Sequence, residues 1–279
     1  MTPRPAYPSD LSDARWALIE PVLAEWRKAR IDRRPTGKPA PTSLREIFNA
    51  ILYLNRTGVP WKYLPHDFPP HGTVYSYYAA WRDEGILAQL GYKLTGLARV
   101  TEGRSPEPTA TIIDTQTIKT SVNVPLTSQG TDAGKKIVGR KRGIVTDALG
   151  LILAVAVTAA SLSDNTIGIR LLDQAKKSYP TISKAWVDTG FKNAAVEHGA
   201  TIGIDVEVVP RNSQARGFQI VKRRWVVERS LGWLMLHRRL ARDYETLDSS
   251  SEAMIYIASI DNLTRRITGE TTQTWRGTY

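Results

Sequence analysis

The segment GIVTDALGLILAVAVTAA, residues 143–160, decides the fold class of this 279-residue chain. It holds two strand-like runs, Gly143–Thr146 and Gly150–Ala160. The residues between them, Asp147-Ala148-Leu149-Gly150, form a turn-rich connection that suits a β-hairpin, in which we expect Asp147 to serve the turn. The sequence therefore predicts an antiparallel pair of strands in the second half of the chain.

Strand-like and helix-like runs alternate on both sides of this hairpin. Further strands are predicted at Ala110–Thr117, Ile182–Val187 and Val206–Val209, and a helix is predicted to begin at Ser163-Asp164-Asn165, with Asp164 as its capping residue. A hairpin followed by alternating strands and helices indicates a mixed sheet with helices on its faces. We therefore expect a mixed α/β (α+β) fold for this part of the chain.

The first hundred residues have helical patterns instead. A helix is predicted to start after Ser12 and to kink or divide at Pro21. A second begins with a capping box of Ser43 and Glu46 and stops at Gly58. A third is expected over 73–85. Three short helices with a basic, proline-rich arm over 30–41 suggest a helix-turn-helix-like DNA-binding unit.

Residues 101–108, TEGRSPEP, have the composition of a linker. The predicted organisation is a helical N-terminal domain over 1–100, this linker, an α/β domain over 109–270 and a tail over 271–279.

Positive charge is concentrated around one carboxylate. The chain has a net charge of +11 and a pI of about 9.8. Nine Lys or Arg residues lie between Arg211 and Arg242, and Glu228 is the only acid among them. Such clustered cations point to a polyanionic partner, which we take to be nucleic acid.

Other classes of protein fit the sequence less well. The chain has no cysteine, so disulfides and thiolate metal sites are excluded. Its longest apolar run, over 149–160, is too short to cross a bilayer, and no signal-peptide core is evident at the N-terminus. No phosphate-cradling P-loop pattern is present, which argues against nucleoside triphosphate hydrolysis. We expect a cytoplasmic, DNA-associated protein that needs no membrane.

Three carboxylates are candidates for a shared site. Asp114 and Asp188 each end a predicted strand, and acids at the ends of neighbouring strands can converge. On a helical projection Glu228 shares an apolar face with Trp225 and Met235, so we expect its carboxylate to face the protein. An unpaired buried carboxylate is costly, so Glu228 should have a cation or strong donors as partner.

Hard oxygen ligands without cysteine favour Mg²⁺ or Mn²⁺ over Zn²⁺. Two such ions can activate an attacking water or hydroxyl and stabilise the leaving oxygen in phosphodiester displacement. We therefore expect two ions held by Asp114, Asp188 and Glu228.

Several passages resemble bacterial insertion-sequence transposases of the DDE superfamily, in particular the insertion-sequence-five type. They run in the same order along nearly the whole chain: LSDARWALIEP from Leu11, RRPTGKP from Arg33, LPHDFPP from Leu64, IDTQTIK from Ile113, GKKIVGRKR from Gly134, and VERSLGWL from Val227 with RRL after it. Together their order and spacing are highly specific.

The resemblance implies a ribonuclease-H-like catalytic domain, a helical N-terminal domain that binds element ends, and a catalytic triad. By motif position the triad is Asp114, Asp188 and Glu228. Arg224, four residues before the glutamate, matches an arginine of the family. Met235 stands where members often carry lysine, and we expect Arg238 or Arg239 to take over phosphate binding there.

Cations from three parts of the chain are expected to contact the DNA backbone. They come from the basic arm, the cluster before the hairpin and the region around Glu228: Arg33, Arg34, Lys135, Lys136, Arg140, Lys141, Arg142, Arg224, Arg229, Arg238 and Arg239. For Lys135–Arg142 the alternative is a solvated loop.

The expected function is a DNA transposase that binds the terminal inverted repeats of its element, cleaves DNA with a metal ion and joins the freed 3′-hydroxyl to target DNA. Pairing two ends favours at least a dimer. Two alternatives stay open: a catalytically inert, transposase-derived DNA-binding protein, and a metal-dependent nuclease that cuts without joining.

Overall fold

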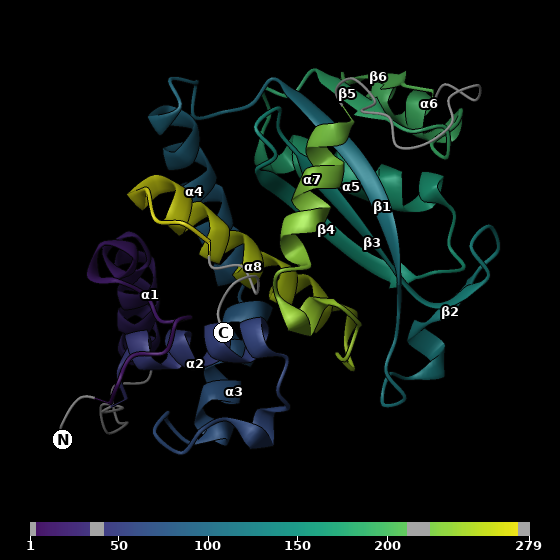
Figure 1. Ribbon diagram of the computed structural model, residues 1–279. Helices are drawn as coiled ribbons and strands as arrows, with labels where there is room; N and C mark the ends of the chain where they lie inside the picture. Colours follow the sequence, from purple (N-terminus) through teal and green to yellow (C-terminus); the bar gives the residue numbers. More distant parts are fainter. Residues whose placement is uncertain (1–3, 34–41, 211–223, 273–279) are drawn as a thin grey trace.

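The computed structural model describes residues 4–33, 42–210 and 224–272 (Figure 1). The α-helices within these residues are α1 Asp13–Arg33, α2 Leu44–Thr57, α3 His71–Asp83, α4 Ile86–Thr101, α5 Asp164–Ser178, α6 Ala194–Thr201, α7 Trp225–Leu234 and α8 Asp248–Thr268. The strands are β1 Ala110–Lys119, β2 Gly130–Asp132, β3 Ile137–Thr146, β4 Ile152–Ala159, β5 Lys184–Val187 and β6 Asp205–Val208. Short 3-10 turns lie at η1 Trp61–Tyr63, η2 Leu126–Ser128 and η3 Arg238–Leu240.

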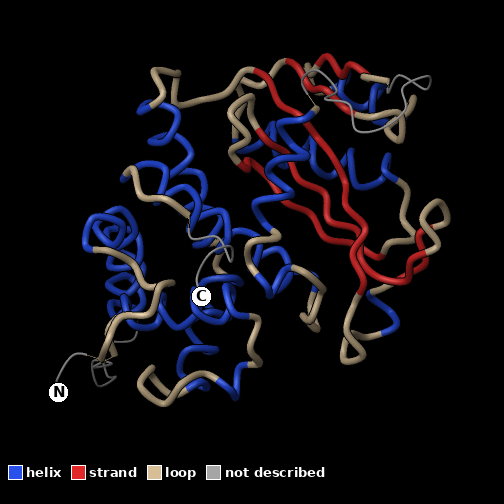
Figure 2. The backbone as a smooth tube through the Cα atoms, viewed as in Figure 1, coloured by secondary structure: helices blue, strands red, loops and turns tan. Residues whose placement is uncertain are grey.

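The strands form one mixed sheet (Figure 2). β1 pairs antiparallel with β3 on one side and parallel with β5 on the other, and β6 continues the sheet parallel to β5. The far edge of β3 pairs first with β2 and then with β4, both antiparallel. The predicted mixed α/β sheet with helices on its faces is confirmed.

The predicted hairpin is formed by β3 and β4, and Asp147 makes its turn. Asp147 Oδ1 accepts backbone hydrogen bonds from Leu149 at 3.0 Å and Leu151 at 2.9 Å. Gly150 has φ +83°, a left-handed conformation that favours glycine. One expectation was wrong: β3 begins at Ile137 rather than Gly143, so Arg140, Lys141 and Arg142 of the basic cluster placed before the hairpin lie inside the strand.

The two faces of the sheet bury separate sets of apolar side chains, as period-two alternation requires. Ile112 of β1 belongs to a core shared with α2, α7 and α8, whereas the adjacent Ile113 belongs to a core shared with α5 and α6. Side chains of β1 that lie on the same face as Ile112 therefore point toward α7.

The N-terminal helices follow the capping signals, with two differences. Ser43 caps α2 by accepting from the Glu46 backbone at 3.4 Å, and Gly58 ends it at φ +80°. Helix α1, however, runs unbroken through Pro21, so the predicted division is wrong. The expected third helix is α3, which begins at His71, and the additional α4 buries Leu90 and Leu94 before the chain enters β1.

Helix α8 lies between the N-terminal helices and the sheet (Figure 1). It contacts α1 to α4 on one side and β4 on the other. Met254, Ile257 and Ala258 are completely buried in a core that continues from α1 to the β1 side of the sheet. The predicted boundary at 101–108 follows α4, but the hydrophobic core does not divide there.

No helix among the described residues is long and apolar enough to cross a membrane.

Candidate active site

Asp114 lies in the middle of β1, which runs from Ala110 to Lys119 and so continues beyond this aspartate. It shares the face of Ile112, toward α7, and is 8% exposed. Its Oδ1 accepts a hydrogen bond from the backbone N–H of Thr115 at 2.8 Å. The expectation that Asp114 ends its strand is wrong, but the strand still presents this carboxylate toward α7.

Asp188 immediately follows β5. The parallel register pairs Ile112 with Trp186, and two residues further along both strands the same register places Asp114 beside Asp188. Asp188 Oδ1 accepts from the backbone N–H of Gly190 at 2.8 Å, which fixes the carboxylate in the turn after the strand. Adjacent parallel strands thus bring together two acids that are far apart in the sequence.

Glu228 comes from the first turn of α7, which packs against β1 and β3. The three carboxylates converge on a single nitrogen, Nη2 of Arg224. Asp114 Oδ2 and Asp188 Oδ2 each lie 3.7 Å from it, and Glu228 Oε1 lies 3.8 Å from it. The structure therefore assembles the three predicted site residues around the arginine one turn before Glu228.

The electrostatics of this cluster are unfavourable for Asp114. Its pKa is raised to about 6, mainly by burial and in smaller part by the nearby charges of Asp188 and Glu228. Arg224 and the Thr115 N–H lower it. Among the described residues, three carboxylates share the guanidinium of Arg224, an arrangement to which a further cation would add favourable charge.

The donor set is chemically suited to a hard divalent cation, because it consists of three carboxylates with no sulfur or imidazole. Within the described ranges no three His, Asp or Glu side chains are arranged to hold a metal ion as they stand. The guanidinium of Arg224, 2% exposed, lies among the acids instead. The chemical type of these three residues fits the expected Mg²⁺ or Mn²⁺. In this structure the guanidinium of Arg224 lies among the carboxylates as a counter-ion.

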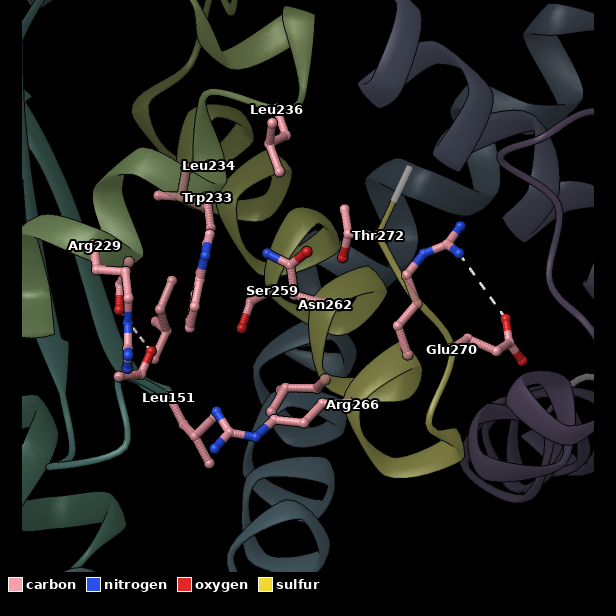
Figure 3. Close-up of a pocket in the computed structure, with 15 residues that line it drawn as sticks. Leu151, Arg229, Trp233, Leu234, Leu236, Ser259, Asn262, Arg266, Glu270 and Thr272 are labelled. Carbon is pink, nitrogen blue, oxygen red and sulfur yellow. Dashed lines mark hydrogen bonds and ion pairs between the residues drawn. The ribbon is translucent and has the colours of Figure 1, made fainter. Parts of the chain in front are cut away.

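Arg229 projects from another side of α7. Its guanidinium lies 4.5 Å from the Trp225 ring and 4.6 Å from the Trp233 ring, and Nη2 donates to the Leu149 carbonyl at 3.0 Å. It lines a cavity of about 620 Å³ between α7 and α8, to which Arg266 also contributes (Figure 3). None of the three carboxylates lines this cavity.

The cluster Arg140, Lys141 and Arg142 is buried in β3, which does not fit the predicted contact with DNA phosphates. Arg140 is fully buried and donates to the Glu245 carbonyl at 2.6 Å and the Ser128 carbonyl at 3.1 Å. It also pairs with Asp243 and with Asp248, at 3.3 and 2.9 Å.

Arg142 and Lys141 likewise donate hydrogen bonds to groups within the protein. Arg142 is 1% exposed and donates to the Leu240 carbonyl at 2.7 Å, and burial lowers its pKa to about 10. Lys141 Nζ donates to the Leu162 carbonyl at 2.8 Å and to Asp164 at 2.9 Å. The structure of these three residues matches neither the expected DNA-contacting loop nor the alternative of a solvated loop.

The remaining predicted DNA contacts differ in exposure. Lys135 and Lys136 are exposed in the turn between β2 and β3, and Arg33 and Arg238 are also exposed. Arg239, by contrast, is 7% exposed and paired with Glu245 at 2.8 Å, so it is poorly placed to replace the family's lysine. Arg34 lies outside the described residues.

Sequence reasoning missed the position of Asp164 relative to the site. Ser163, not Asp164, caps α5, accepting from the Thr166 backbone at 3.2 Å. Asp164 is therefore free to bond to Thr115, the neighbour of Asp114, and to Lys141. The serine next to Asp164 was the one signal that a second capping residue was available.

Comparison with protein families agrees with this geometry. A family model for a transposase of the IS4/5 family matches residues 11–90, and one for the transposase DDE domain matches residues 105–263. No curated protein matches the chain. The second match covers more than half of the sequence and all three carboxylates, and the mixed sheet with its helices is consistent with a ribonuclease-H-like fold. The chain therefore belongs to the DDE transposases of the IS4/5 type.

Proposed function

We propose that this transposase binds the terminal inverted repeats of its element, cleaves DNA at the element ends and transfers the freed 3′-hydroxyl to target DNA. The observation that carries the proposal is the convergence of Asp114, Asp188 and Glu228 on one nitrogen of Arg224, within 3.8 Å. A purely DNA-binding protein has no need to hold three carboxylates this close, since their mutual repulsion costs stability.

Transposase DDE domains generally use divalent metal ions. In this chain Asp114, Asp188 and Glu228 would hold them, and we propose two Mg²⁺ or Mn²⁺ ions. When bound, such a pair supplies activation of the attacking oxygen and stabilisation of the leaving oxygen.

The protein itself supplies position and charge. Strand β1 carries Asp114, the turn after the neighbouring parallel strand β5 carries Asp188, and α7 carries Glu228 over them. Arg224 neutralises part of their charge before any cation enters. The planar guanidinium of Arg224, with its group of donors, would also suit a DNA phosphate bound at this site.

The proposed phosphate contacts leave out the cations that are buried in the structure, with Arg224 as the exception because of its place in the site. Arg229 is half-buried, and Arg34 lies outside the described residues. We keep Arg33, Arg34, Lys135, Lys136, Arg224, Arg229 and Arg238, and leave out Arg140, Lys141, Arg142 and Arg239. Two further exposed cations lie near Lys136 along the lip of one cavity, Lys119 and Arg242. We also propose that at least two copies act together, because two element ends must be paired.

The test is Asp188→Asn, with Asp205→Asn as the matched control. Asp205 is a carboxylate at the start of β6 that pairs with Lys184 at the surface, 73% exposed. A labelled element end, a target plasmid and Mg²⁺ are supplied to each protein. Wild type and Asp205→Asn should cut and join, while Asp188→Asn should bind DNA with normal affinity and lose at least about 10³-fold in cleavage.

The products separate the alternatives. Cut ends without joined ends from wild type indicate a nuclease, and DNA binding without any product indicates an inert DNA-binding protein. Cleavage by Asp188→Asn at the wild-type rate would show that the triad assignment is wrong.

A further inference from the structure

We propose that Asp164 is a positioning residue of the active site: from the first turn of α5 it fixes the turn that carries Asp188 and the strand residue next to Asp114. This inference rests on the proposed function, because it concerns how the same carboxylates are held.

Asp164 joins two strands of the sheet on the side opposite the triad. Its Oδ1 accepts from Thr115 Oγ1 on β1 at 2.9 Å and from Lys141 Nζ on β3 at 2.9 Å. Thr115 points away from the face that carries Asp114, as alternation along a strand requires. Asp164 thus restrains the backbone of β1 directly beside the first catalytic aspartate.

The other oxygen of Asp164 faces the turn after β5. A Cβ on Gly190 would lie 2.5 Å from Asp164 Oδ2 and 2.9 Å from Asp188 Oδ1. Both carboxylates therefore approach the same glycine Cα, and a side chain there would push them apart. The N–H of this glycine also donates to Asp188 Oδ1.

Two more contacts hold the first turns of α5 to this turn. Asn165 Oδ1 accepts from the Lys192 backbone at 2.8 Å. Phe191 packs so closely on Gly168 that a Cβ on Gly168 would lie 2.6 Å from the ring. Helix α5 thus meets the turn over 188–192 at three points, by the hydrogen bond of Asn165, by the packing of Gly168 on Phe191 and by the close approach of the Asp164 carboxylate to Gly190, which is the point nearest Asp188.

This arrangement matters for chemistry because Asp114 and Asp188 repel each other. Catalytic groups must be held to within about 0.5 Å by supporting side chains. A carboxylate beyond the end of β5 has no strand partner to fix it, so it depends on its turn. Lys141, 8% exposed on its side chain, compensates the charge of Asp164, so the support does not add to the repulsion.

The experiment compares Asp164→Ala and Asp164→Asn with Asp173→Asn. Asp173 lies on the same helix and pairs with His198 at 2.7 Å, away from the triad. Three quantities are measured: Mn²⁺ affinity of the DNA-free protein by calorimetry, kcat and KM for cleavage of an element end, and Tm.

For Asp164→Ala we expect Mn²⁺ affinity and kcat to fall by about 10–100-fold, with KM for DNA unchanged. Asp164→Asn keeps an acceptor for Thr115 and should recover part of the loss, and Asp173→Asn should match wild type. Because Asn has nearly the shape of Asp, Asp164→Asn is expected to fold. Its Mn²⁺ affinity and kcat therefore test the inference if Asp164→Ala does not fold.

Wild-type Mn²⁺ affinity and kcat in both Asp164 variants, beside a loss of Mn²⁺ binding in Asp188→Asn, would overturn this inference alone. A lower Tm with unchanged Mn²⁺ affinity would also overturn it, since that is the signature of a merely structural ion pair. Wild-type protein that neither binds Mn²⁺ nor cuts DNA would overturn the proposed function and this inference with it.

Discussion

Two buried arginines, Arg140 and Arg224, stand at the centre of two acidic clusters that differ in every detail of bonding. Arg140 makes close contacts of 2.6–3.3 Å with two carboxylates and with backbone carbonyls. Arg224 is shared by three carboxylates at 3.7–3.8 Å, and its Nε has no hydrogen-bond partner among the described residues.

The difference distinguishes a structural cluster from the cluster that we propose to be catalytic. A buried guanidinium repays its desolvation only when short, well-directed bonds satisfy its donors. Arg140 meets that condition and ties β3 to the segment before α8. Arg224 does not, because the three carboxylates that share it within the described residues lie at distances too long for strong bonds. An arrangement of that kind suits a site that is completed by another charged species.

The largest effect should come from breaking the saturated cluster. Arg140→Met leaves Asp243 buried without its cation, so we expect the free energy of unfolding in urea to fall by about 3–5 kcal/mol. Arg170→Met is the control: Arg170 pairs with Glu252 at 2.7 Å but is 45% exposed on its side chain, and its loss should cost about 0–1 kcal/mol. Equal costs for the two variants would contradict a structural role specific to Arg140.

An intermediate effect, with a pH dependence, is expected at the unsaturated cluster. The pKa of Asp114 is raised from 3.8 to about 6 in the folded protein. Its contribution to stability is therefore fully present below pH 3.8 and is lost as the pH rises through about 6. Asp114→Asn lacks this dependence, so relative to wild type it should gain up to about 3 kcal/mol between about pH 4 and pH 7.

Urea unfolding of both proteins at several pH values across that range measures this difference. Asp205→Asn is the control, because it removes an exposed carboxylate whose partner Lys184 stays charged throughout this range, and its difference from wild type should stay small. A constant difference between Asp114→Asn and wild type would show that Asp114 is not strained by burial and by its acidic neighbours.

The smallest effect on folding, and a clear one on DNA binding, is expected from exposed cations of the β2–β3 region. Changing Lys135 and Lys136 to Gln should leave the urea midpoint unchanged. The slope of log affinity against log salt should become less steep by about 0.9 for each phosphate that the variant no longer neutralises. Lys177→Gln, on the exposed side of α5, is the control and should keep the wild-type slope. An unchanged slope in the double variant would exclude this turn from the DNA surface.

The triad could be predicted because its signals are local. Each aspartate follows an apolar run that predicts a strand, and Glu228 is recognisable as one acid among many cations. Asp114 proved to be inside its strand, yet the prediction of convergence survives, since parallel neighbours in register bring equivalent positions together wherever they lie along the strand. The mixed sheet was likewise predictable from its alternation of strands and helices.

The buried, structural role of Arg140 and Arg142 could not be predicted from local sequence signals. A basic run is typical of solvated loops, and what overrides that tendency is a set of acids and carbonyls about 100 residues later, for example Asp243. The use of Asp164 depends in the same manner on tertiary partners, Thr115 and Lys141. Composition reports charge, but only the fold shows whether a charge has already been neutralised.

Helix α8 also sets the order in which this protein can form. Helices α1 to α4 leave the ribosome before the sheet, but the hydrophobic core between them is completed by Met254, Ile257 and Ala258, which are synthesised after the sheet. Until then the first helices present an open hydrophobic face. Because the closing contacts join the beginning and the end of the chain, we expect slow, largely post-translational folding and a nascent chain that depends on chaperones.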